Sequence, residues 1–166
     1  MQFDQPRFEI FSGTLLVGMR THMSLKENTT RDLWSRFMPA RKEIRNVRGS
    51  DLYSVEVYDD TTFFRNFDPG KTFEKWAAVA VDTLTETLPV GMEGLEIEAG
   101  LYVVFSYTGF PSEAHKMYAY IYGHWMPDSG YEPDSRPHFA LMGSGYKGEH
   151  PESQEELWIP VRKRMS

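Results

Sequence analysis

Residues that could bind a metal are few and scattered along the chain. The sequence has no cysteine, which excludes disulfides, thiol nucleophiles and thiolate ligands. None of its five histidines lies in the HExxH spacing of a zinc hydrolase. His115 and His124 fall on one expected helix, but about 900° of helical rotation separates them, so they point to opposite sides. We therefore expect no metal site and no other cofactor.

Serine nucleophiles and phosphate-binding loops are not indicated either. Gly143-Ser144-Gly145 lacks the spacing of a GxSxG nucleophile elbow. No GK[ST] follows these glycines, and no GxGxxG is present. The acidic residues between 149 and 156 are expected to form a solvated loop. No catalytic group stands out.

Aromatic side chains remain as the candidate binding groups, and they make up 14% of the chain. Their flat rings with polar edges suit a binding cavity, although the core is the more common place for them. Ten fall on segments expected to border a cleft: Tyr58, Trp76, Tyr102, Phe105, Tyr118, Tyr122, Trp125, Tyr131, Phe139 and Trp158. All except Tyr118 and Trp158 are predicted to contact a ligand.

The first half of the chain predicts strand, helix, strand, strand. The expected segments are a strand at 7–18, a helix at 29–39 and strands at 52–58 and 75–81. Gly13 marks a bulge in the first strand. Thr29 and Asp32 resemble a capping box, and Pro39 limits the helix. Alternation in the second strand puts Glu56 and Tyr58 on one face.

The second half repeats this order. After a short extended piece at 95–97 come a strand at 101–107, a helix at 111–127 that Pro127 ends, and strands at 137–142 and 157–161. The apolar stripe of that helix is Ala114, Met117, Tyr118, Ile121 and Trp125. We expect an α+β fold of one domain, 1–166, with pseudo-repeats at about 7–82 and 95–162. These would form one mostly antiparallel curved sheet with two helices and a central cleft.

Charge and hydropathy exclude several kinds of partner. The chain has 18 basic and 24 acidic residues, and its net charge of −6 argues against binding nucleic acid. No stretch approaches the ~20 apolar residues that cross a bilayer. The N-terminal residues do not resemble a secretory signal. A cytoplasmic protein without a membrane partner is the expectation.

Several short segments together resemble one known family. Residues 31–34 (RDLW) and 37–39 (FMP) are similar to the first-helix motif of the GyrI-like family, the effector-binding domain of AraC- and MerR-type transcription activators of bacteria. The other similar segments are 73–79 (FEKWAAV), 100–105 (GLYVVF), 125–132 (WMPDSGYE), 136–139 (RPHF) and 155–161 (EELWIPV). Each is short, but they follow in order over nearly the whole chain.

This resemblance implies two strand–helix–strand–strand repeats around a cleft that binds lipophilic, often cationic, drugs or dyes. In regulators the domain is fused to a helix-turn-helix segment. Because there is no room for such a segment before Arg7, we expect the stand-alone form.

One position departs from the family pattern. Many members carry a glutamate after the Phe of the Pro-His-Phe strand, where it meets the ligand's positive charge; this chain has Ala140. Ala80 likewise stands where close relatives often have an acidic residue. A cation in a dry cleft needs a partner for its charge. Either Glu56 takes that role or the ligand is neutral, and the neutral ligand is the preferred alternative. Glu56 and Ala140 complete the predicted ligand-binding set.

The leading hypothesis is therefore a small-molecule-binding protein that sequesters or senses a lipophilic aromatic ligand. Two alternatives stay open. Some GyrI-like proteins hydrolyse cyclopropane-containing alkylating compounds, and here base assistance would have to come from Glu56, a weak candidate, or from a tyrosine. The other alternative is sequestration of a protein partner such as a gyrase.

Overall fold

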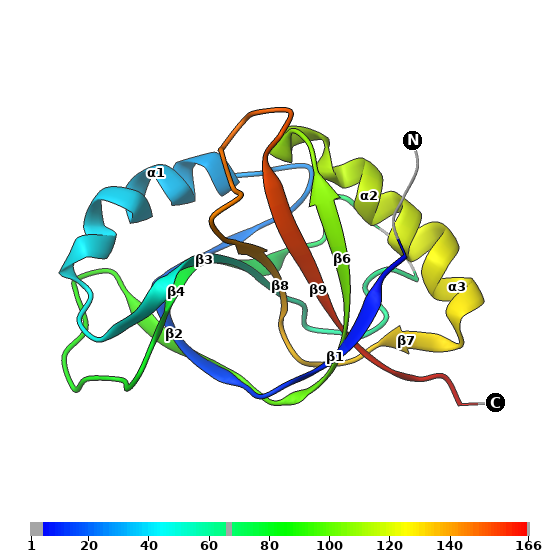
Figure 1. Ribbon diagram of the computed structural model, residues 1–166, viewed down its shortest axis with the longest axis horizontal. Helices are drawn as coiled ribbons and strands as arrows, with labels where there is room; N and C mark the ends of the chain where they lie inside the picture. The colour runs from blue at the N-terminus through cyan, green and yellow to red at the C-terminus, as the bar shows by residue number, and fades with distance from the viewer. Residues whose placement is uncertain (1–4, 66–67, 166) are drawn as a thin grey trace.

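A computed structural model describes residues 5–65 and 68–165 (Figure 1). The first half contains β1 (Arg7–Phe11), β2 (Thr14–Met23), α1 (Thr30–Ala40), the 3-10 turn η1 (Arg41–Glu43), β3 (Val47–Val57) and β4 (Phe73–Val81). The second half contains β5 (Glu93–Ile97), β6 (Gly100–Thr108), the 3-10 turn η2 (Pro111–Glu113), α2 (Ala114–Tyr120), the π-helical turn η3 (Ile121–Trp125), α3 (Met126–Ser129), β7 (Tyr131–Pro133), β8 (His138–Met142) and β9 (Gln154–Lys163). Among the described residues, no helix is long and apolar enough to span a membrane.

The strands form one curved antiparallel sheet in the order β1-β6-β9-β8-β3-β4-β2-β5, with β7 added beside β9. Outward from the central β3–β8 pair, the order is β3-β4-β2 on one side and β8-β9-β6 on the other. These six strands therefore repeat one relative order in the two halves of the chain. The outermost strands cross over, since β5 of the second half pairs with β2 and β1 of the first half pairs with β6. The predicted α+β class with a mostly antiparallel curved sheet is confirmed.

The two helices lie on the same side of the sheet, to either side of the β3–β8 pair (Figure 1). On α1, Leu33 and Phe37 pack against Ala77 and Val79 of β4. The α2 side chains Ala114, Met117 and Ile121 belong to a second core with Val103, Phe105, Leu157 and Ala140. We call this side of the sheet the helix face.

The opposite face buries a separate aromatic core as the sheet curls. Tyr102 and Phe139 are almost fully buried there, and Phe11 packs its ring 5.6 Å from that of Tyr102 and 5.3 Å from that of Phe139. Trp76, Ala78 and Ala80 lie in the same core. The curl of the sheet, rather than a covering helix, keeps these rings from water.

Four local predictions need correction. Residues 7–18 are two strands, since Gly13 adopts φ +92 and redirects the chain from β1 beside β6 to β2 beside β4. Thr29 makes no side-chain capping bond, so the capping box is wrong. Pro39 lies within the last turn of α1. Pro127 does not end its helix, because η3 first widens the hydrogen-bonding pattern and α3 then continues to Gly130 at φ +81.

Gly18 is the place where β2 comes closest to β4. A methyl group there would overlap the carbonyl oxygen of Ala77 and lie 2.7 Å from the Cα of Ala78. Since these are backbone atoms in a paired ladder, they cannot move aside cheaply. We expect Gly18→Ala to lower the free energy of unfolding by about 3 kcal/mol, measured by urea denaturation.

The control is Gly123→Ala on the exposed side of η3, where a new Cβ meets nothing within 4 Å. It should raise stability by about 0.5–1 kcal/mol, because alanine restricts the unfolded chain. Equal effects at the two glycines would contradict the close approach of β2 and β4.

Candidate functional site

Three polar side chains form a row across the middle of the helix face. Glu56 on β3 lies opposite Lys75 on β4 and opposite His138 on β8. All three residues are buried, at 8%, 8% and 6% exposure. Because antiparallel partners point to the same side of a sheet, the register itself brings an acid, a base and an imidazole together.

Glu56 and Lys75 form a buried ion pair. The Nζ atom of Lys75 lies 3.4 Å from Oε2 of Glu56. That carboxylate oxygen nevertheless has no hydrogen-bond partner among the described residues. Burial raises the pKa of Glu56, and the ammonium of Lys75 offsets part of the rise. An incompletely satisfied buried carboxylate is unusual and often marks a functional place.

His138 is held neutral in this row. Burial lowers its pKa to about 3, and its Nδ1 lies 3.0 Å from the hydroxyl oxygen of Tyr122. In the tautomer protonated at Nε2, the tyrosine hydroxyl donates to Nδ1. Tyr122 stands on the π-helical turn η3, a geometry that is frequent at functional sites.

Three tyrosines surround the carboxylate. Burial raises the pKa of Tyr58, Tyr118 and Tyr122 well above the ordinary value, and the nearby charge of Glu56 raises each further. All three hydroxyls therefore stay protonated at neutral pH and can donate hydrogen bonds. We name the set Glu56, Lys75, His138, Tyr58, Tyr118 and Tyr122, together with Phe64 described next, the central cluster.

Phe64 closes one end of the central cluster. Its ring is stacked on that of Tyr122, with centroids 3.7 Å apart and an interplanar angle of 5°. Tyr58 packs against both Phe64, at 5.0 Å, and His138, at 4.8 Å. A cavity of about 110 Å³ lies beside the rings of Tyr58, Phe64 and His138. The rest of its lining is mainly polar and includes Asp59, Asp60, Asp134 and Arg136. Sites for drug-sized molecules typically hold about 300–1,000 Å³, so the cavity alone is too small for one.

Glu155 on β9 is a second carboxylate near the cluster. Its pKa rises to about 7, mainly through burial; Lys75 lowers it and Glu56 raises it. The prediction that residues 149–156 form a solvated loop is wrong for this residue, because β9 begins at Gln154. Glu155 stands two positions before the buried Leu157 on the same strand, and this alternation was the available signal.

The predicted ligand-binding residues divide into four groups. Glu56, Tyr58 and Tyr122 belong to the central cluster, and Ala140 faces it from the next row of the sheet, opposite Ser54. Phe105 and Trp125 pack edge to face at 5.2 Å in the core under α2 and η3.

The remaining predicted residues lie elsewhere. Tyr131 packs against Phe8, with ring centroids 4.9 Å apart. Trp76, Tyr102 and Phe139 point to the opposite face, into the core inside the curled sheet, as does Ala80. The predicted set is therefore not one contiguous surface.

Sequence reasoning missed four members of the central cluster. Lys75 and His138 fall on the helix face by simple alternation along their strands, which was a usable signal. Tyr118 was placed on a segment expected to border the cleft and in the apolar stripe of its helix, but not among the predicted ligand contacts. Phe64 lies between β3 and β4, where no periodicity predicts its position.

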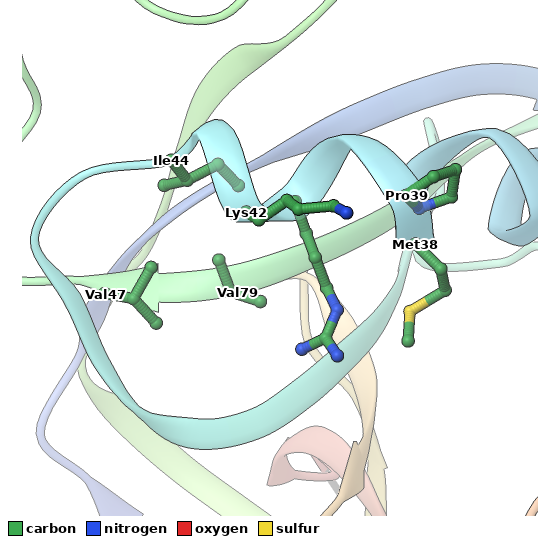
Figure 2. A pocket seen from close by; sticks show the side chains of 7 residues that line it. Met38, Pro39, Lys42, Ile44, Val47 and Val79 are labelled. Carbon is green, nitrogen blue, oxygen red and sulfur yellow. The ribbon is translucent and has the colours of Figure 1, made fainter.

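A second, open hollow lies at the C-terminal end of α1 (Figure 2). Its walls are apolar side chains, including Met38, Ile44 and Val79, and the cations Arg41 and Lys42. None of the described residues that line it is a buried polar group, so it offers no chemistry comparable to that of the central cluster.

Comparison with known proteins gives a consistent picture. The family model Cass2, described as integron-associated effector binding protein, matches residues 12–161. The transcriptional regulator BrlR of Pseudomonas aeruginosa is 25% identical over 160 residues, which cover 95% of this chain and 53% of BrlR. This chain thus spans about half the length of that curated relative.

Solved structures share the fold. The integron cassette protein VCH_CASS2 of Vibrio cholerae superposes with a TM-score of 0.70 at 18% identity, covering 96% of this chain and 97% of that one. SAV2435 bound to tetraphenylphosphonium gives a TM-score of 0.67 at 14% identity, covering 96% and 94%. At these identities the likeness concerns the architecture.

His138 should make stability depend on pH. Its pKa is about 3 in the folded chain against 6.5 ordinarily, so the unfolded state binds one more proton between these values. The contribution of His138 to stability is therefore complete above pH 6.5, and it falls by about 1.4 kcal/mol per pH unit as the pH drops through this window. We expect His138→Asn, which keeps an acceptor for Tyr122, to remove that slope in urea titrations at pH 4–7. His22→Asn, at an exposed position, should leave it in place; identical slopes in the two variants would refute the neutral buried imidazole.

Glu155 should contribute with the opposite sign. Its pKa of about 7 exceeds the ordinary 4.5, so the folded state keeps a proton that the unfolded chain has lost between these values. Its contribution is lost as the pH rises through this window. Glu155→Gln should therefore improve stability at pH 8 relative to pH 5 by about 2 kcal/mol compared with the parent. Glu152→Gln, whose parent side chain is 73% exposed, is the control and should give no change.

Proposed function

Since the chain belongs to the Cass2 family of integron-associated effector binding proteins, we propose that it binds a lipophilic aromatic small molecule at the central cluster. The observation that carries the proposal is the packing of Tyr58, Tyr122 and Phe64 around His138. His138 lies beside Glu56, a buried carboxylate whose Oε2 atom has Lys75 as its ion-pair partner and accepts no hydrogen bond among the described residues. Aromatic walls with a few placed polar groups are the usual make-up of a small-molecule site.

In this proposal Phe64 occupies the position that an aromatic ring of the ligand would take on binding. It contributes a single ring, stacked flat on Tyr122, from a segment that connects two strands. A ligand ring that displaced Phe64 would gain the same face of Tyr122 together with the adjoining cavity of about 110 Å³. The tyrosine hydroxyls would orient polar groups of the guest.

The relatives support this class of ligand. SAV2435, which shares the fold, has been solved with tetraphenylphosphonium, a cation of four phenyl rings. BrlR is a transcriptional regulator of which this chain matches about half. We therefore place the protein among effector-binding modules that sense or sequester such compounds.

Binding is tested with two probes of similar shape, tetraphenylphosphonium and the neutral triphenylphosphine oxide. A ligand at the central cluster should raise the melting temperature by mass action and change tryptophan fluorescence. Isothermal titration then gives the affinity. If neither probe, nor a wider panel of polyaromatic compounds, produces heat or a thermal shift, the proposed function is wrong.

Removing the side chain of Phe64 should increase the affinity for the ligand. Without its stack on Tyr122, worth about 0.5–1.5 kcal/mol, Phe64→Ala should bind triphenylphosphine oxide roughly 2–10-fold more tightly. Tyr122→Ala should bind it more weakly, because the stacking face is gone. Phe110→Ala, at a partly exposed phenylalanine outside the cluster, should match the parent. Weaker binding by Phe64→Ala would show that Phe64 is a wall of the site rather than its occupant.

A further inference from the structure

We infer that Lys75 sets the charge preference of the central cluster, so that neutral aromatic molecules are accepted over cations of the same shape. The inference rests on the proposed function and extends it to a specificity-determining residue. Its basis is the position of one ammonium group beside the carboxylate that would otherwise receive a cationic guest.

The ion pair is built into the sheet. Lys75 and Glu56 are direct partners in the β3–β4 ladder, so their backbones hold the two side chains on the same face. Their charged atoms are 3.4 Å apart, and each side chain is only 11% exposed. Neither group can turn to solvent without leaving the other charge buried and unpaired, which is strongly unfavourable.

This ion pair reduces the attraction of the Glu56 carboxylate for a cationic ligand. A cation at the central cluster would meet Glu56 already neutralised and would lie close to the ammonium of Lys75. In a dry site, like charges repel far more strongly than they do in water. A neutral guest meets no such repulsion and can accept hydrogen bonds from the tyrosine hydroxyls.

The other groups that face Glu56 do not supply a free negative charge. His138 on β8 is neutral, and Ala140 on the same strand carries no charge. Tyr58, Tyr118 and Tyr122 remain protonated. Glu155 on β9 interacts with Glu56, and with a pKa of about 7 it is only partly ionised at neutral pH. Asp59, Asp60 and Asp134 line the adjoining cavity on its loop side, where Asp134 pairs with Arg136 and Arg162. Lys75 therefore offsets the one carboxylate of the row.

The decisive variant is Lys75→Met, which keeps the apolar stem and removes the charge. The parent should bind triphenylphosphine oxide more tightly than tetraphenylphosphonium. In Lys75→Met the affinity for tetraphenylphosphonium should rise at least tenfold, and that for triphenylphosphine oxide should stay within threefold. The gain for the cation is expected because the guest then takes the place of Lys75 as the partner of Glu56. It should vanish in Lys75→Met/Glu56→Gln.

Two further variants separate the site effect from net charge and from folding. Lys116→Met removes a positive charge from the exposed side of α2 and should change no affinity. Glu56→Gln leaves Lys75 without its partner, so this variant should gain affinity for the anion tetraphenylborate. The Glu56→Gln variant tests the inference even if Lys75→Met does not fold.

The outcomes are distinguishable. A parent that prefers tetraphenylphosphonium, or a folded Lys75→Met that binds the neutral probe and gains no affinity for the cation, would overturn the role of Lys75 and leave the proposed function standing. Failure of tetraphenylborate to gain on folded Glu56→Gln would also overturn it. No binding of any probe by the parent or its variants would reject the proposed function itself.

Discussion

The register of the three central strands is the constraint on which the candidate site depends. It sets Glu56 between Lys75 and His138, and the hydrogen-bond ladders on both sides prevent a shift of one residue. Such a shift would turn every side chain of β3 to the opposite face. It would exchange Glu56 for Val55 or Val57, both of which belong to the aromatic core inside the curl. The apolar character of that core thus fixes where the charges lie.

The two faces of the sheet have different roles, since one forms an aromatic core and the other carries the polar cluster. The inner face holds most of the large rings of the strands, including Tyr102 and Phe139, and needs no helix to exclude water. The helix face is covered by α1 and α2 near its ends (Figure 1). The middle, over β3 and β8, is left for polar side chains. A fold with two similar halves therefore produces a polar, enclosed centre where the halves meet.

Much of the architecture could be predicted from alternation and helical periodicity, and the α+β class and the sheet type followed from these. Glu56 and Tyr58 were placed on one face for the same reason. Alternation does not say which face meets the helices, however, and Trp76, Tyr102 and Phe139 lie on the other one. Phe64 could not be placed, because its position depends on a stack with Tyr122 on a distant segment. The pairing of Glu56 with Lys75 required the strand order, which no local pattern contains.

The stack of Phe64 on Tyr122 also bears on which molecules the proposed site would bind. A side chain of the same polypeptide competes at a high effective concentration, as a tethered ligand does. A free compound with one ring offers nothing that Phe64 does not already provide, so abundant small aromatic metabolites would be turned away. Only molecules whose additional rings also fill the neighbouring space gain enough to displace it. Competition with Phe64 would thus select for ligands that are larger than a single aromatic ring.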